Sequence, residues 1–256
     1  MTEAEHTRVL CITGMHRSGT SLTASWLRRC GLPIDDGEVY GAASGNQLGV
    51  FEDKEFVLLQ AQRMRDLVPG SRGWVYTKPW PLQTTDAFRE RSAELAGRRS
   101  ESYRDWGWKD PRSTLFLDHW LEIIPELKVV ALWRRAAEVV ESLVARSRAS
   151  DHPALQIDET SALRVWLAYN KCLLKFKLAH PRQVLLFRID RLLERDREAL
   201  ALINAHLNYS LCERRLSDLY DPNLMNRYPP SWIQRATCRM RGARHVERQL
   251  VRASDL

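Results

Sequence analysis

Residues 8–21 place a cation and three hydroxyl groups directly after an apolar segment. Arg8 to Thr13 is typical of a buried strand, Gly14 and Gly19 bound a short turn, and a helix is expected from Gly19 onward. Successive backbone N–H groups in such a turn, followed by the positive end of a helix, attract phosphate oxygens. The expected phosphate contacts are His16, Arg17, Ser18, Gly19, Thr20 and Ser21.

The spacing of this turn is close to that of the nucleoside-triphosphate loop, but one residue differs. Gly14, Gly19 and Ser21 stand in the right places, whereas Thr20 occupies the position of the lysine. A kinase or ATPase needs that lysine and a metal-binding carboxylate at the end of another strand, and no strand of that kind stands out. A cation inside the turn, at Arg17, favours a sulfuryl or monophosphate donor without a bound metal.

Two further cationic loops follow predicted strands later in the chain. The first lies in the segment Trp106 to Arg112, a short aromatic strand that ends in a charged loop and carries Lys109 at its centre. In the second, Arg134 leaves the end of the strand 128–133 and Ser142 lies eight residues on, two turns into the next helix. Both side chains can face one ligand, which predicts a second phosphate-binding position.

The chain resembles the sulfotransferases that use 3′-phosphoadenosine 5′-phosphosulfate (PAPS), and among them a bacterial branch, over about its first 210 residues. The resemblance lies in four ordered motifs: Gly14 to Ser21, Gly49 to Glu52, Trp106 to Arg112, and Arg134 to Ser142. It implies a 5′-phosphosulfate held by the first turn, a 3′-phosphate held by the last motif, and adenosine 3′,5′-bisphosphate (PAP) as product. One departure is Ala136, where the family usually has proline or glycine.

Three catalytic residues are expected. Arg17, where many relatives have lysine, is assigned as an electrostatic clamp because a guanidinium stays protonated, and Lys109 as the second cation and acid. The histidine that some relatives use as base is missing after Lys109. Other relatives use a glutamate shortly after the first loop and helix, and the resemblance implies that Glu52, which stands at that position, is the base. We expect Phe51 to raise the pKa of Glu52. The alternative is that Glu52 or Asp53 caps the helix 53–67.

Strands and helices alternate along the chain, which predicts an α/β fold: three layers, with a central, mostly parallel, P-loop-like sheet flanked by helices. Ligands of such sheets bind beyond the carboxyl ends of the strands, where the three cationic loops converge. Segments 32–51 and 149–158 are candidate lids or acceptor loops, and Trp74 and Trp80 are candidate acceptor contacts. The expected helices are 19–30, 53–67, 84–98, 113–124, 136–148, 160–179 and 191–206; the expected strands are 8–13, 105–109, 128–133 and 184–189.

The chain has 256 residues and a net charge of +7, and the excess lies mostly at its end. From Asp221 onward seven arginines stand against three acidic residues. Residues 1–220 are therefore assigned to the sulfotransferase domain and 221–256 to a basic C-terminal extension, partly helical or flexible, that is expected to pack over the nucleotide site. There Arg227 is expected to reach the 3′-phosphate, and Arg235 to Arg252 to form a solvated basic helix.

Neither a nucleic-acid platform nor a membrane span is expected, because no interleaved basic and aromatic stretch and no run of eighteen apolar residues occurs. Five cysteines without a C-x-x-C pair indicate a reducing compartment, and the N-terminal residues do not form a secretory signal, so a cytoplasmic protein is expected. No metal site is expected.

Three functional hypotheses remain open at this point. The first is transfer of a sulfuryl group from PAPS to a hydroxyl or amine of a small molecule, glycan or lipid. The second is a magnesium-dependent nucleotide kinase. The third is a nucleotide-binding module without catalysis. The acceptor and the oligomeric state do not follow from the sequence.

Overall fold

A computed structural model describes residues 7–34, 51–219 and 229–256 of the chain. Its centre is a four-stranded sheet in the order β2-β1-β3-β4, in which every neighbouring pair is parallel. The strands are nearly continuous apolar runs, as expected for a parallel sheet with both faces covered. The predicted α/β fold is confirmed. The strands are β1 (Arg8–Gly14), β2 (Asp105–Lys109), β3 (Lys128–Trp133) and β4 (Val184–Arg188).

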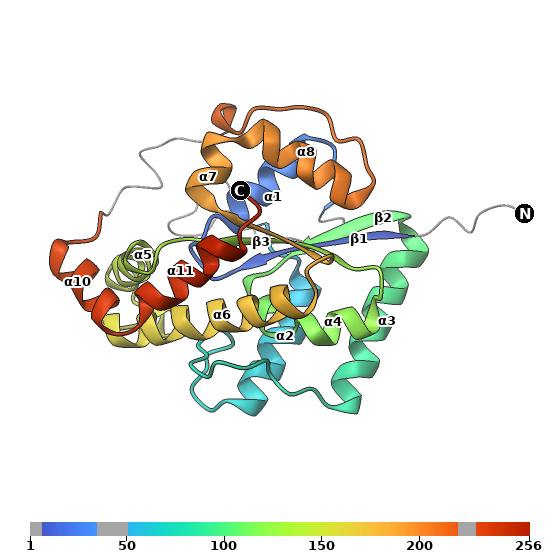
Figure 1. Ribbon diagram of the computed structural model, residues 1–256. Helices are drawn as coiled ribbons and strands as arrows, with labels where there is room; N and C mark the ends of the chain where they lie inside the picture. The colour runs from blue at the N-terminus through green and yellow to red at the C-terminus, as the bar shows by residue number, and fades with distance from the viewer. Residues whose placement is uncertain (1–6, 35–50, 220–228) are drawn as a thin grey trace, which may run out of the picture.

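One face of the sheet is covered by helices α1, α7 and α8 (Figure 1). Their apolar side chains pack on alternate residues of the strands, because successive side chains in a strand point to opposite faces. Sheet residues on this face are Leu10, Ile12, Val130, Leu132 and Phe187. The helix bounds are α1 (Thr20–Arg29), α7 (Ile189–Glu194) and α8 (Asp196–Leu207), and a short 3₁₀ helix, η3 (Leu216–Asp218), follows.

The opposite face carries a larger helical layer and the larger core. The long helix α6 (Glu159–Ala179) runs beneath the sheet and has twelve buried residues, among them Trp166 and Tyr169. The other helices of this layer are α2 (Lys54–Leu67), α3 (Asp86–Ser102), α4 (Leu117–Ile123) and α5 (Ala136–Arg148), with two short 3₁₀ helices, η1 (Pro111–Leu115) and η2 (Pro153–Leu155).

The C-terminal helices α10 (Trp232–Met240) and α11 (Ala243–Ala253) belong to this same layer. Val246 and Leu250 of α11 are buried in the core beside α6. The chain then reaches β4, where Asp255 N–H donates to the Leu186 carbonyl at 2.9 Å and the Asp255 carboxylate pairs with Lys177. The expected solvated helix is therefore wrong for α11, which is amphipathic and packed on one side.

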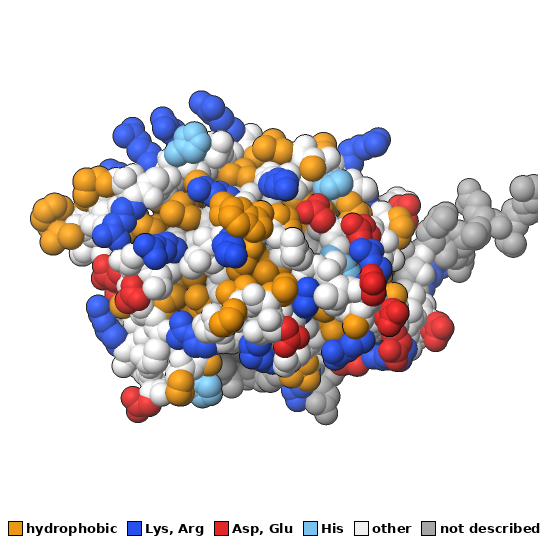
Figure 2. Space-filling model, turned by 90° about the horizontal axis from the view of Figure 1, so that it is seen from below, with side chains coloured by type: hydrophobic (Ala, Val, Ile, Leu, Met, Phe, Trp, Pro, Cys, Tyr) orange, Lys and Arg blue, Asp and Glu red, His pale blue; other side chains and the backbone are white. Residues whose placement is uncertain are grey.

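The surface seen from the α2–α6 side carries Lys and Arg over its whole extent, whereas many acidic side chains gather toward the right of the view (Figure 2). Within the described residues, no helix has the length and apolarity needed to cross a membrane. The five cysteines are free thiols, and Cys11 and Cys30 are buried as expected.

Two predicted helices are each divided in the structure. The expected helix 113–124 is η1 followed by α4, and Pro111 stands at the start of η1 as predicted. The expected helix 191–206 is α7 followed by α8, and the break lies at Arg195. There the buried carboxylate of Asp196 accepts the N–H of Leu216, so a tertiary contact selects the break.

The order of the strands places a topological switch point between β1 and β3, where parallel sheets generally form a ligand-binding crevice. The chain leaves β1 and returns in β2 on one side, whereas it leaves β3 and returns in β4 on the other side. Because the two connections diverge, space is left beyond the carboxyl ends of β1 and β3, where ligands of parallel sheets bind. This crevice lies between the turn that follows Gly14 and the loop that begins at Arg134.

Candidate active site

The turn after β1 depends on two glycines. Gly14 has a φ of +136°, and a Cβ on it would lie 2.1 Å from the carbonyl oxygen of Leu132 on the neighbouring strand. Gly19 has a φ of +92°, and a Cβ there would lie 2.5 Å from Ile189. At Gly14 the obstacle is backbone, so no other residue fits, whereas at Gly19 the Ile189 side chain can shift and the positive φ is what favours glycine.

The N-terminus of α1 has the properties of an anion-binding site. Gly19 caps the helix and has no side chain to accept its N–H groups, and the first turn contains no acidic residue. Ser18, in the turn just before, is fully buried, and its Oγ has no hydrogen-bond partner among the described residues. A buried hydroxyl without a partner next to uncapped N–H groups fits a phosphate oxygen.

Arg17 joins this turn to the helix that follows β3. Its backbone lies in the left-handed region, at φ 69°, and its Nε donates to Ser142 Oγ at 2.9 Å. Burial, together with the nearby charge of Arg134, lowers the pKa of Arg17. Arg134 is also buried, and its Nε pairs with Glu138 at 2.8 Å. The structure thus brings together Arg17, Arg134 and Ser142, which were expected to hold the donor.

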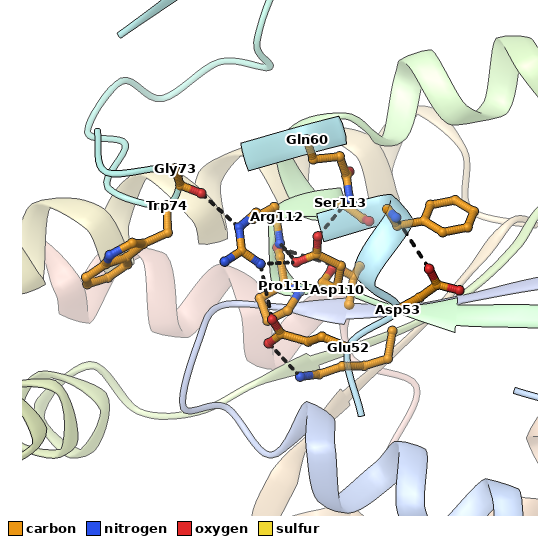
Figure 3. A network of polar contacts seen from close by, with 12 residues as sticks. Glu52, Asp53, Gln60, Gly73, Trp74, Asp110, Pro111, Arg112 and Ser113 are labelled. Atoms are coloured by element: carbon orange, nitrogen blue, oxygen red, sulfur yellow. Dashed lines mark hydrogen bonds and ion pairs between the residues drawn. The ribbon is translucent and has the colours of Figure 1, made fainter. Parts of the chain in front are cut away.

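Lys109 and Glu52 form a buried ion pair beside the turn (Figure 3). Lys109 ends β2, is 1% exposed, and places Nζ 3.0 Å from Glu52 Oε1 and 3.1 Å from Ser21 Oγ. Thr114 Oγ1 accepts the N–H of Gly14 and fixes the loop after β2 against the turn. All three residues expected to be catalytic therefore lie at the carboxyl end of the sheet.

Arg112 holds the second oxygen of Glu52. Its NH1 lies 3.2 Å from Glu52 Oε2 and 2.8 Å from Asp110 Oδ1, and its Nε donates to the Gly73 carbonyl (Figure 3). Burial lowers the pKa of Arg112, but the carboxylates of Asp110 and Glu52 outweigh it and raise that pKa above its usual value. Gln60 donates to the other oxygen of Asp110, which makes Asp110 a fixed support for the guanidinium.

The expected raised pKa of Glu52 is wrong. Burial raises the pKa of this carboxyl group, but the charges of Lys109 and Arg112 outweigh burial and hold the pKa at about 2. The two cations were known from the sequence, whereas their distances to Glu52 were not. The helix-cap alternative applies to Asp53, which accepts the N–H groups of Glu55 and Phe56 at the start of α2.

One half-buried cation at the site was missed by sequence reasoning. Arg146 lies one turn after Ser142 on α5, with its guanidinium 5.4 Å from the ring of Trp74. Its Nε is buried and has no hydrogen-bond partner among the described residues. The spacing of four residues from Ser142, which places both on one face of the helix, was the available signal.

The backbone N–H of Ala136 has a structural role that the sequence comparison with the family did not predict. Its N–H, at the start of α5, donates to Glu247 Oε1 of α11 at 2.8 Å. A proline at this position has no N–H to donate. Because Ala136 follows Arg134 by two residues, α11 supports the loop that carries Arg134. Arg227, the tail residue expected at the 3′-phosphate, lies outside the described residues.

Of the two candidate acceptor tryptophans, only Trp74 lies at the site. Trp74 is 4% exposed, packs edge-on against His16 with 5.4 Å between ring centroids, and donates its Nε1 to the Ala154 carbonyl. Ala154 belongs to the candidate lid 149–158, so this segment is fastened to the site through Trp74. Trp80 is 52% exposed. Most of segment 32–51 lies outside the described residues.

No family model and no curated protein sequence matches this chain significantly. Several solved structures, however, match its fold. The sulfotransferase domain from the Synechococcus PCC 7002 olefin synthase aligns at 18% identity with a TM-score of 0.52, covering 97% of this chain and 95% of that one. The sulfotransferase domain from the curacin biosynthetic pathway aligns at 16% identity with a TM-score of 0.48, covering 88% of this chain and 79% of that one. Sulfotransferase STF1 from Mycobacterium tuberculosis aligns at 14% identity with a TM-score of 0.47, covering 96% of this chain and 76% of that one. The structural neighbours are thus sulfotransferases, and this chain is a sulfotransferase-fold protein.

Proposed function

We propose that this protein is a PAPS-dependent sulfotransferase that acts on a hydroxyl or amine of a small-molecule, glycan or lipid acceptor. The observation that carries the proposal is the contact between Arg17 and Ser142, which joins the two predicted phosphate-binding motifs across the crevice between β1 and β3. The buried pair of Lys109 and Glu52 beside it supports an enzyme rather than a binding module.

The turn and the α5 motif are assigned to the donor. The uncapped N–H groups of α1 and the hydroxyl of Ser18 suit the 5′-phosphate, and Arg134 with Ser142 suits the 3′-phosphate. The donor supplies the sulfuryl group and leaves as PAP. Arg17 contacts Ser142, so it lies between the two phosphate positions and stabilises negative charge that develops on the leaving nucleotide.

Lys109 and Glu52 are assigned to the reacting centre. In the chain alone, a pKa of about 2 makes the Glu52 carboxylate ionised but a weak base. An anion bound at the turn adds negative charge near Lys109 and weakens its hold on Glu52, which raises the pKa of the carboxyl group. Glu52 then accepts the proton of the acceptor, while Lys109 stabilises charge on the transferred group.

The C-terminal segment is assigned to support of the donor site. Glu247 of α11 binds the N–H of Ala136, two residues after Arg134, and Ser254 accepts the Nε1–H of Trp133 at the end of β3. Both contacts hold the loop between β3 and α5. The domain boundary near residue 220 therefore separates two segments that act on one site.

Calorimetry with PAP and with ATP tests the donor assignment. We expect saturable binding of PAP without added metal, and weaker binding in Arg17→Lys. Transfer of labelled sulfate from PAPS to a panel of hydroxylated metabolites, glycans and lipids, followed by mass spectrometry, tests the reaction. Lys109→Ala should abolish transfer, with Lys128→Ala as the control, a half-buried lysine at the start of β3. Saturation by ATP together with indifference to PAP overturns the proposal in favour of a kinase.

A further inference from the structure

Arg146 is a half-buried cation whose counter-charge is missing from the described part of the chain. Its Nε is inaccessible and forms no hydrogen bond among the described residues. Burying a polar atom of a charged group without a partner is costly unless a ligand completes the site. The side chain is therefore arranged for an anion that is not part of the described chain.

The charges around Arg146 support the same conclusion. Burial, together with the nearby charges of Arg17 and Arg112, lowers the pKa of Arg146 to about 10, and the carboxylate of Glu52 offsets only part of this effect. The single negative charge of Glu52 is already shared by Lys109 and Arg112, one at each oxygen, and no ion pair joins it to Arg146. Positive charge therefore exceeds negative charge on the Arg146 side of the site.

The groups beside Arg146 suit an organic anion. The Trp74 ring lies 5.4 Å from the guanidinium, and its Nε1–H is already donated to Ala154. His16 packs against Trp74, is 9% exposed, and has an Nε2 without a hydrogen-bond partner. Burial and the charge of Arg112 lower the pKa of His16, so the imidazole is neutral and offers a hydrogen bond rather than a second charge. The positive charge of Arg146, the hydrogen-bonding imidazole of His16 and the apolar ring of Trp74 are thus adjacent.

The position of Arg146 differs from that of the donor motifs. It lies one turn beyond Ser142, on the side away from Arg134, and within electrostatic reach of Glu52. Resting on the proposed function, we propose that Arg146 and His16 bind an anionic oxyacid group of the acceptor, so that the acceptor is a hydroxylated carboxylate or phosphate ester rather than a neutral alcohol.

Thermal unfolding of the full chain saturated with PAP tests this site apart from the donor site. Inorganic phosphate and acetate are added separately at constant ionic strength made up with chloride. We expect one or both to raise the Tm of the wild type saturably, and to leave Arg146→Met unchanged. The phosphate and acetate arms distinguish a phosphate ester from a carboxylate. Arg148→Met, an exposed arginine on the same helix, is the control and should respond as the wild type does.

The second variant is Arg146→Lys, which keeps the positive charge. We expect the two anions to raise its Tm less than that of the wild type, but measurably. Equal responses in wild type and Arg146→Met, or no response to either anion, overturn the proposal. Loss of PAP affinity by tenfold or more in Arg146→Met also overturns it, because Arg146 then belongs to the donor site. A chain that does not bind PAP at all contradicts the proposed function, while the anion response, measured without PAP, still reports on Arg146.

Discussion

Arg17 and Ser142, which are far apart in the sequence, form a direct hydrogen bond of 2.9 Å between Nε and Oγ. Arg17 belongs to the turn after β1 and Ser142 to the second turn of α5, so the contact spans the crevice between β1 and β3. A ligand with two phosphates can therefore touch both motifs with one guanidinium between them.

Ser142→Ala should weaken PAP binding about tenfold, since a hydrogen bond to a charged group contributes roughly 1.5–3 kcal/mol. Calorimetry measures the effect. Ser147→Ala is the matched control, because Ser147 is also on α5 but bonds Gln156 and the N–H of Ile157. That control should lose stability and keep its affinity. An unchanged affinity of Ser142→Ala removes the α5 motif from the donor site.

Glu52→Gln should lower kcat by about 100-fold or more while PAP still binds, as expected when a general base is removed. It should also lower the free energy of unfolding, because Lys109 and Arg112 lose the carboxylate that neutralises them. Rapid-quench kinetics and urea denaturation measure the two effects. A variant with parental turnover shows that Glu52 is a structural counter-ion only.

Glu247→Ala should cost about 1 kcal/mol of stability, because Ala136 N–H loses its acceptor at the start of α5. In an Ala136→Pro background the same change should cost less, since proline has no N–H to satisfy and is tolerated in the first turn of a helix. Urea denaturation of the wild type, the two single variants and the double variant measures the coupling free energy between the two positions. Additive effects would show that the contact does not stabilise the fold.

Stability should fall as pH drops from about 6.5 to 4, partly because of His119. Burial, with the charge of Arg89, lowers the pKa of this imidazole to about 4. Between the two pKa values the unfolded chain binds a proton that the folded chain excludes, so this histidine's contribution is present above 6.5 and is lost below it.

The loss attributable to His119 is about 1.4 kcal/mol per pH unit within that window. His119→Gln, which can still bond Ser92, should show a correspondingly shallower dependence of unfolding free energy on pH. His245→Gln, at an exposed position on α11, should keep the dependence of the wild type. Identical slopes in wild type and His119→Gln would mean that this histidine does not titrate differently on folding.

The local patterns were sufficient for the elements that carry the site. An apolar run followed by Gly14 and Gly19 determined strand, turn and helix, because both positions have a positive φ that favours glycine. Strand–loop–helix units repeated along the chain indicated a parallel sheet, and with it the edge at which Lys109 and Arg134 lie. These features depend on neighbours in the sequence, which is why the sequence alone determined them.

Tertiary structure decided the charges of the site and the fate of the tail. The pKa of Glu52 follows from its distances to Lys109 and Arg112, which come from other segments of the chain, and a neighbouring Phe51 did not reveal them. Packing on α6 turned the basic α11 into part of the core, and the fold buried Nε of Arg146 without a hydrogen-bond partner among the described residues. Electrostatic energy and burial depend on separation in space, and separation in space between distant segments is set only by the fold.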